Sequence, residues 1–83
     1  MKKYLVDIYL PATGKHYDVY LPTGKRIGEA TQLLVNIAEY LSGGSYKGTS
    51  GAVLINAING VPLNRKDTVY DAGIRNSSKL ILI

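Results

Sequence analysis

The sequence predicts a two-layer α+β domain in which one helix packs across a mixed β-sheet. Three observations predict it: two alternating runs near the N-terminus, one segment of helical period after them, and short β-rich segments in the C-terminal half. A sheet with one apolar face needs a helix to cover it, and this chain offers only one helical segment. We therefore expect the order hairpin, helix, strand, short edge strand, turn and last strand (ββαββ), with four to five strands in the sheet.

The first hairpin is predicted from alternation on both sides of a turn. Residues 4–10 and 16–21 alternate with a period of two, which is the spacing of side chains along a strand. Pro11 and Gly14 lie between the two runs. Pro presets φ and Gly accepts a positive φ, so these residues favour a tight connection.

A helical period begins after residues 22–24. Apolar residues spaced by three and four positions fall on one helical face: Ile27, Ala30, Leu34, Ile37 and Leu41. We expect Thr23 to cap the N-terminus of this helix and a glycine at 43 or 44 to end it in the left-handed conformation. Residues 44–51 then form a loop.

The second half predicts two strands around a turn. Residues 52–58 are β-rich, and their register stays open between two sets that compete for the inner face: Val53, Ile55 and Ala57, or Leu54 and Ile58. Asn59-Gly60 predicts a two-residue type I′ turn, in which both central residues have φ > 0.

The chain then predicts an edge strand, a turn and a last strand. Residues 61–63 must lie at a sheet edge, because Pro62 cannot donate a ladder hydrogen bond. Residues 68–74 predict a tight helical turn, and residues 79–83 the last strand.

Composition restricts the classes of function. Eighty-three residues predict a single domain over 1–83, and the absence of Cys excludes disulfides and Cys-based zinc sites. No segment resembles a signal peptide or a membrane span, so we expect a cytoplasmic protein without membrane insertion. The net charge of +4 comes from scattered Lys and Arg with no run longer than two, so we expect no nucleic-acid partner.

No set of residues predicts catalysis. His16 is the only histidine and has no Cys with which to form a metal or nucleophile site. Lys47 precedes Gly48 in a loop that leads into a strand, which is the wrong order for a phosphate-binding loop. Asp67 and Asp71 are typical of turn caps. We expect no enzyme activity, no metal and no cofactor.

Several segments resemble ubiquitin. Thr13-Gly14-Lys15 stands at the first hairpin, as in ubiquitin, and residues 68–74 (TVYDAGI) resemble the family's Thr-Leu-Ser-Asp-x-x-Ile segment. The apolar positions from Tyr17 to Leu34, and Leu80 with Leu82, follow the spacing of the ubiquitin core. The chain thus resembles the ubiquitin-like β-grasp family over nearly its whole length, which implies that fold.

One departure from ubiquitin concerns the C-terminus. The sequence stops at Ile83 without the Gly-Gly that ubiquitin and the sulfur carriers activate, so we expect neither conjugation nor sulfur transfer.

The chain is most similar to the small YukD/EsaB-type ubiquitin-like proteins of type VII secretion systems in Gram-positive bacteria. Residues 71–82 also resemble the ubiquitin-like cytosolic domain of those systems' membrane channel component. The resemblance implies an accessory or regulatory protein that acts by non-covalent contact. The alternative is a small β-grasp subunit of a multicomponent enzyme such as a bacterial monooxygenase.

One sheet face is predicted to bind a partner. In ubiquitin-like domains the first strand lies between the second and the last. If Val6, Ile8, Leu80 and Leu82 face the helix, five residues share the open face: Leu5, Tyr9, Tyr20, Ile81 and Ile83. Exposed apolar groups on a small domain are typical of an interaction site, although a layer of side chains or a weak homodimer is an alternative cover.

Overall fold

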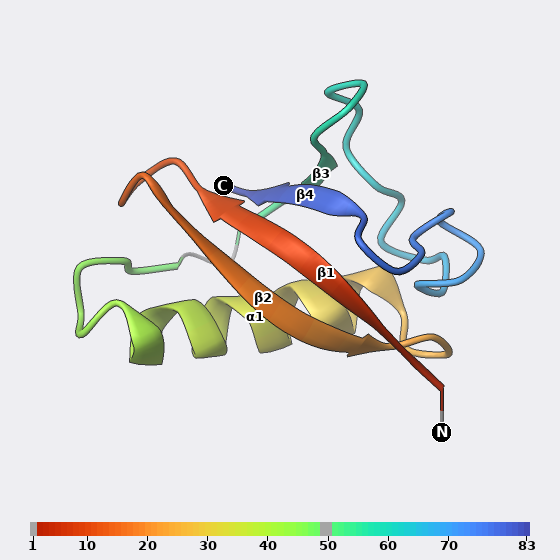
Figure 1. Ribbon diagram of the computed structural model, residues 1–83, viewed down its shortest axis with the longest axis horizontal. Coiled ribbons are helices and arrows are strands. Elements are labelled where there is room, and N and C mark those ends of the chain that lie inside the picture. The colour runs from red at the N-terminus through yellow and green to blue at the C-terminus, as the bar shows by residue number, and fades with distance from the viewer. Residues whose placement is uncertain (1, 49–50) are drawn as a thin grey trace.

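The computed structural model describes residues 2–48 and 51–83, and it has the predicted two layers, with one helix lying across one face of a mixed sheet (Figure 1). The elements are β1 (Lys3–Leu10), β2 (Lys15–Pro22), α1 (Ile27–Leu41), β3 (Leu54–Asn56) and β4 (Lys79–Leu82). The strand order is β2-β1-β4-β3, with β1 parallel to β4 and the other neighbours antiparallel. The predicted α+β class and the place of β1 between β2 and β4 are confirmed.

The first hairpin forms where it was predicted. The backbone N–H groups of Thr13 and Gly14 both donate to the Leu10 carbonyl, at 3.1 and 2.8 Å. Gly14 has φ 69°, the left-handed conformation that its lack of a side chain permits. Eight residue pairs then align β1 with β2.

The buried face of α1 differs from the predicted one. Its members are Ile27, Ala30, Thr31, Leu34, Val35 and Ala38. Ile37 is only half-buried and Leu41 is 49% exposed, so both were wrongly assigned to the core. Thr31 can be buried because its hydroxyl donates to the Ile27 carbonyl at 2.7 Å. Thr31, Val35 and Ala38 were not among the residues predicted for this face.

The N-terminus of α1 is capped by the backbone of a distant loop. The prediction that Thr23 caps the helix is wrong, because the N-cap is Arg26 and it makes no side-chain cap bond. The N–H groups of Ile27 and Gly28 donate instead to the carbonyls of Asp67 and Arg65, at 2.8 and 3.0 Å. At the other end, Gly43 has φ 62° and ends the helix as predicted.

The strand after the loop is shorter than predicted. Of residues 52–58, only Leu54–Asn56 form β3. Leu54 is buried opposite Leu82, whereas Ile55 lies outward opposite Ile81, which settles the open register. Residues 49 and 50 of the preceding loop lie outside the described residues.

The turn at residues 57–60 is longer than the predicted type I′ turn. Asn56 accepts from the Gly60 N–H at 2.8 Å and donates to the Val61 carbonyl at 3.0 Å, so four residues form the loop. Gly60 has φ 72°, but Asn59 does not have a positive φ. The carboxamide oxygens of Asn56 and Asn59 accept from the N–H groups two residues further on, at 2.9 Å each, and these local bonds replace the tighter turn.

The remaining segments partly follow the prediction. Residues 61–63 lie at the predicted edge, where Pro62 forms a bridge with Ile55 and the Leu63 N–H donates to the Leu54 carbonyl at 2.9 Å. Residues 68–74 form turns, and the Ala72 N–H donates to the Thr68 carbonyl at 2.9 Å, which closes a single helical turn as predicted. Ile83 follows β4 and exchanges two backbone hydrogen bonds with Val53.

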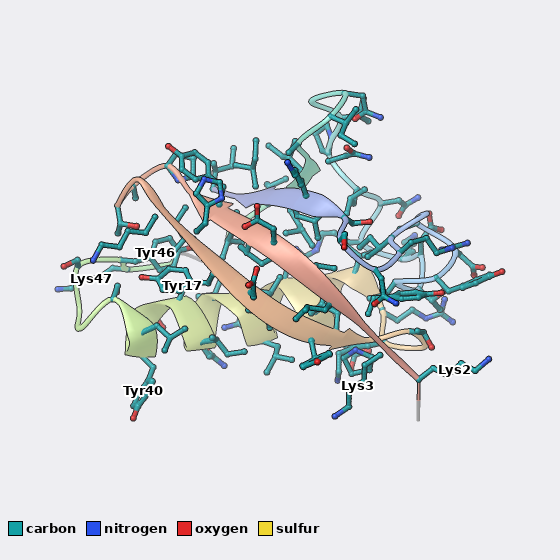
Figure 2. The ribbon with its side chains drawn as sticks, viewed as in Figure 1. Lys2, Lys3, Tyr17, Tyr40, Tyr46 and Lys47 are labelled. Carbon is teal, nitrogen blue, oxygen red and sulfur yellow. The ribbon has the colours of Figure 1, made fainter. Side chains whose placement is uncertain are left out.

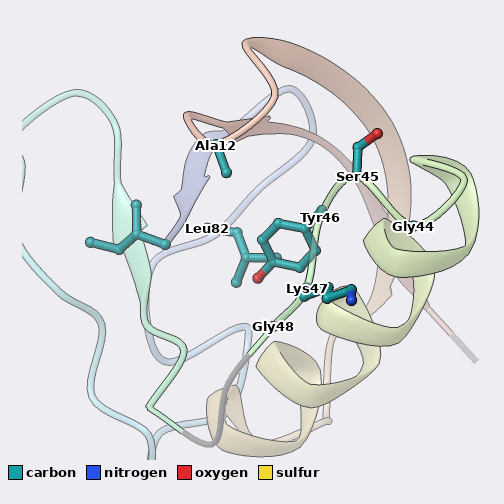
Figure 3. Close-up of a pocket in the computed structure, with 8 residues that line it drawn as sticks. Ala12, Gly44, Ser45, Tyr46, Lys47, Gly48 and Leu82 are labelled. Carbon is teal, nitrogen blue, oxygen red and sulfur yellow. The ribbon is translucent and has the colours of Figure 1, made fainter.

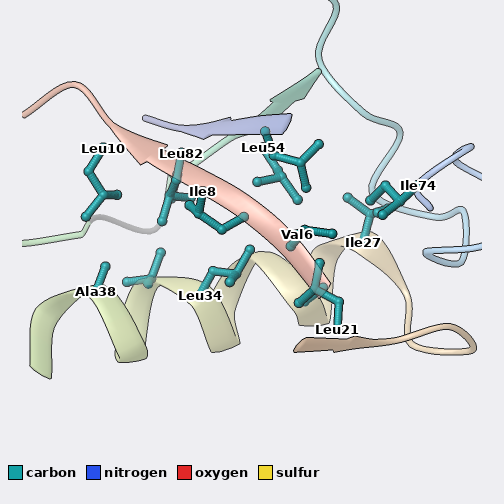
Figure 4. Packing of buried hydrophobic residues seen from close by; sticks show 14 of the residues in the cluster. Val6, Ile8, Leu10, Leu21, Ile27, Leu34, Ala38, Leu54, Ile74 and Leu82 are labelled. Carbon is teal, nitrogen blue, oxygen red and sulfur yellow. The ribbon is translucent and has the colours of Figure 1, made fainter. Parts of the chain in front are cut away.

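The core lies between α1 and the inner sheet face (Figure 4). Its members come from every strand and from the loops: Val6, Ile8, Leu10, Leu21, Ile27, Ala30, Leu34, Val35, Ala38, Tyr46, Ala52, Leu54, Val69, Ile74, Leu80 and Leu82. α1 covers one face only, so the opposite face of the sheet remains open. Over the part of the chain that the structure describes, no helix has the length and apolar character to cross a membrane.

Candidate interaction surface

Strand registers arrange the open sheet face into rows that cross the strands. Residues directly opposite each other on neighbouring strands point to the same face. Three rows result: Tyr20 with Leu5; Asp18, Asp7 and Lys79; and His16, Tyr9, Ile81 and Ile55. We call them the Leu5 row, the Asp7 row and the Tyr9 row.

All five residues predicted for the interaction site lie on this face, but they do not form one patch. Leu5 and Tyr20 pair across β1 and β2, and Tyr20 is 61% exposed. Tyr9 and Ile81 pair in a separate row and are partly buried, and exposed Ile83 lies two residues beyond Ile81. The Asp7 row lies between the two groups, so the sheet presents two apolar areas divided by charge.

The sequence prediction missed two members of the face. Ile55 extends the Tyr9 row onto β3, and the pairing of Val53 with Ile83 continues the apolar area beyond it. Both remained undetermined because the register of residues 52–58 was open. The sequence did not show that the strand within residues 52–58 ends at Asn56.

Charged and aromatic side chains meet at the division between the rows. His16 Nδ1 lies 3.1 and 3.2 Å from the two carboxylate oxygens of Asp7. The rings of Tyr9 and His16 stack at an angle, with centroids 4.6 Å apart. His16 is exposed and contacts both Asp7 and Tyr9.

Asp18 differs from Asp7 in having no such neighbour. It stands directly opposite Asp7 on the edge strand β2 and is exposed. Within residues 2–48 and 51–83, no side-chain hydrogen bond or ion pair involves its carboxylate.

The opposite side of the molecule carries a smaller apolar area at the end of α1. Tyr40 is 85% exposed, and its side chain projects away from the body of the domain (Figure 2). Leu41 lies beside it in sequence. These two residues come from one helical turn, so they present less surface than the open sheet face.

A pocket of about 540 Å³ lies between the tip of the first hairpin, the loop after α1 and the end of β4 (Figure 3). It is lined by Ala12, Gly44, Ser45, Tyr46, Lys47, Gly48, Leu82 and Ile83. Burial, and secondly the charge of Glu39, raise the pKa of Tyr46, which keeps its phenol neutral. The lining combines the Tyr46 phenol, the Ser45 hydroxyl and the exposed Lys47 amine with apolar groups, and the Glu39 carboxylate accepts from the Gly48 N–H of the same loop.

Metal binding finds no support in the described residues. No group of three His, Cys, Asp or Glu side chains there is arranged to hold an ion. The described residues offer groups for non-covalent binding: apolar rows, aromatic rings and a pair of carboxylates.

Comparison with known proteins identifies the fold. No protein-family model and no curated protein sequence matches the chain. Solved structures do match, including the ubiquitin-like domain of the Mycobacterium tuberculosis type VII secretion system protein EccD1 (18% identity, TM-score 0.66, 100% of this chain and 99% of that one). The ubiquitin-like domain of EccD5 from Mycobacterium xenopi has a TM-score of 0.74 at 16% identity, covering 100% and 94% of the two chains.

A third match comes from an enzyme assembly. A chain of the toluene 4-monooxygenase HD complex has a TM-score of 0.77 at 8% identity, over 98% of this chain and 96% of that one. Identities this low establish architecture rather than function. Together with the strand order and the single crossing helix, they show that the chain has a ubiquitin-like β-grasp fold.

Proposed function

We propose that this protein acts by non-covalent contact with another protein through its open sheet face, as an accessory or regulatory component of a type VII secretion system. The observation that carries the proposal is the apolar surface of that face. Tyr20, Leu5 and Ile83 are exposed although α1 has already covered the other face of the sheet. Apolar and aromatic groups in that position are typical of protein interfaces.

The secretion role draws its support from the EccD domains. Both are ubiquitin-like domains, and one is described as part of a type VII secretion protein. The chain spans them almost end to end, so the likeness concerns the whole domain and not a shared fragment. A cytoplasmic accessory protein of the YukD/EsaB type would use the same fold on its own.

The second candidate is a subunit of a multicomponent monooxygenase. The chain from the toluene 4-monooxygenase complex is at least as similar in shape as the EccD domains are, although its identity is lower. As such a subunit, the protein would use its open face to bind and stabilise a catalytic chain. Both candidates use the face for binding and assign no reaction to this chain.

The genes beside the coding sequence separate the two candidates. A secretion ATPase and small Trp-Xaa-Gly helical-hairpin proteins nearby are expected for the secretion role. A diiron hydroxylase nearby would overturn that role in favour of the monooxygenase.

A pair of tyrosine variants tests the surface itself. Tyr20→Ser removes an exposed ring from the open face, so it should leave the unfolding midpoint nearly unchanged and reduce export of the small secretion substrates. Tyr40→Ser removes an exposed ring from the far side of α1 and is the matched control. Measured by immunoblots of culture supernatants at equal cellular protein, equal export by both variants and the unmodified protein would contradict the proposal.

A further inference from the structure

We propose that the open face recognises its partner through an arginine side chain that lies across the Asp7 row, held by Asp18 and Asp7 between the two apolar areas. This inference rests on the proposed function and specifies the chemistry of the partner. It starts from the carboxylate pair in the Asp7 row, which lies between two rows of apolar and aromatic residues.

The carboxylate pair is unfavourable for the isolated domain. Asp7 and Asp18 stand directly opposite each other on antiparallel strands, where like charges repel. Lys79 is the strand partner of Asp7 on β4, and His16, two residues from Asp18 on β2, contacts the Asp7 carboxylate. Asp18 lies at the outer edge of the sheet, where neither Lys79 nor His16 is its direct strand partner. A cation brought by a partner would relieve this repulsion.

The distribution of charge supports a cationic partner group. The whole chain carries a net charge of +4, so a basic partner would be repelled by most of its surface. The centre of the open face has the opposite sign. Electrostatic complementarity of this kind fixes the position and orientation of a partner more than it adds affinity.

The neighbours of the carboxylate pair favour arginine over lysine. Tyr20 follows Asp18 by two residues on the same face of β2, and the stacked rings of Tyr9 and His16 lie on the other side of the row. A guanidinium can donate two hydrogen bonds to a carboxylate and at the same time stack on an aromatic ring, whereas an ammonium acts as a point charge.

The spacing of the rows sets the neighbours of that arginine. Residues i and i+2 of a strand are about 7 Å apart, so the Leu5 row and the Tyr9 row each lie about 7 Å from the Asp7 row. A partner segment in extended conformation matches this spacing when apolar side chains stand two residues before and two residues after its arginine. The occupant is therefore an apolar-x-Arg-x-apolar segment of another protein.

Titration of the intact ¹⁵N-labelled chain with short peptides tests the inference. The probes are Ac-Leu-Ser-Arg-Ser-Ile-NH₂ and the same peptide with citrulline, which keeps the shape of arginine and loses its charge. Amide shifts should centre on Asp18, Asp7 and Tyr20, and the citrulline peptide should bind about three- to tenfold more weakly. Raising NaCl from about 20 to about 300 mM should weaken the arginine peptide more than the citrulline peptide.

Two variants locate the arginine preference. Asp18→Asn should abolish the difference between the peptides, while Glu29→Gln, on the exposed side of α1, should leave it intact. Because Asp18 is exposed, the Asn variant should keep the dispersed spectrum of the folded domain.

Three results would overturn the inference. Equal binding of both peptides to the open face would remove the arginine preference and leave the docking function standing. Shifts centred on α1, or a preference that survives Asp18→Asn, would place recognition elsewhere. No binding of either peptide to the open face would also refute it, whereas the proposed function is judged separately by its own variants.

Discussion

Gly48 is the residue at which the loop after α1 approaches the helix most closely. A methyl group at this position would overlap Cγ1 of Val35 and lie 3.3 Å from its Cβ. The Gly48 N–H also donates to a carboxylate oxygen of Glu39 at 3.2 Å. Residues 44–51 were predicted only to form a loop, and the contact shows that one of its glycines packs against α1.

Replacing Gly48 should therefore destabilise the fold. Gly48→Ala forces Val35, a β-branched residue of restricted rotamer, to move, and we expect a loss of about 1–3 kcal/mol. Gly24→Ala is the control, since no atom lies within 4 Å of the added methyl group and its φ is not positive. Urea titrations with indistinguishable midpoints for the two variants would show that the loop does not pack against α1.

Tyr46 couples stability to alkaline pH. Burial, and then the charge of Glu39, raise its pKa in the folded protein above the value of about 10 in the unfolded chain. The folded state thus binds the phenolic proton more tightly, and this contribution to stability is complete below about pH 10. It is lost as the pH rises through the folded pKa.

Removing the Tyr46 hydroxyl should reduce this loss of stability at high pH. Tyr46→Phe has no proton to release, so its free energy of unfolding should fall less steeply between about pH 9.5 and 11.5 than that of the unmodified protein. Tyr40→Phe, at an exposed ring, is the control. Parallel curves for the Tyr46 variant and the unmodified protein would contradict burial of the phenol.

At the scale of elements, helix α1 shows what periodicity predicts and where it fails. Spacing identified Ile27, Ala30 and Leu34 as core residues, and all are buried. It failed in the last turns because it left out Thr31, Val35 and Ala38, and their inclusion rotates the buried face away from Leu41. The true centre of the face depends on which strands lie beneath it, and a single segment does not contain that information.

Two identical truncations on α1 test the observed face. Leu34→Ala, at a side chain 2% exposed, should cost about 2–5 kcal/mol, whereas Leu41→Ala, at 49% exposed, should cost less than about 1 kcal/mol. Thermal or urea unfolding measures both. Equal losses would mean that the helix presents the face that spacing alone predicted.

Helix ends and turns were harder to predict than the helices and strands themselves. The N-terminus of α1 is satisfied by carbonyls of Arg65 and Asp67, which are about forty residues away, and no local pattern at Thr23 encodes that contact. At residues 57–60 the Asn59-Gly60 pair marked the turn correctly, but side-chain bonds from Asn56 and Asn59 chose its length. Long-range capping and competing local hydrogen bonds thus account for both errors.

At the scale of the whole molecule, the sheet order determines what the open face offers. Alternation along each strand predicted which residues point outward, and all five predicted interaction residues do. Whether they form one patch depends on the register between strands, which places Asp7, Asp18 and Lys79 in a single row. The sequence therefore predicted the members of the candidate surface but not its division by charge, and their role in binding remains a prediction.

The most direct test of the open face as the working surface is site-specific photo-crosslinking in the organism that encodes the chain. A benzophenone amino acid placed at Tyr20 on the sheet, or at Tyr40 on the far side of α1, replaces an exposed ring in each case. Irradiation should yield a discrete crosslinked adduct from position 20 and none from position 40. An adduct from position 40 alone, or the same adducts from both positions, would contradict the assignment of the open sheet face.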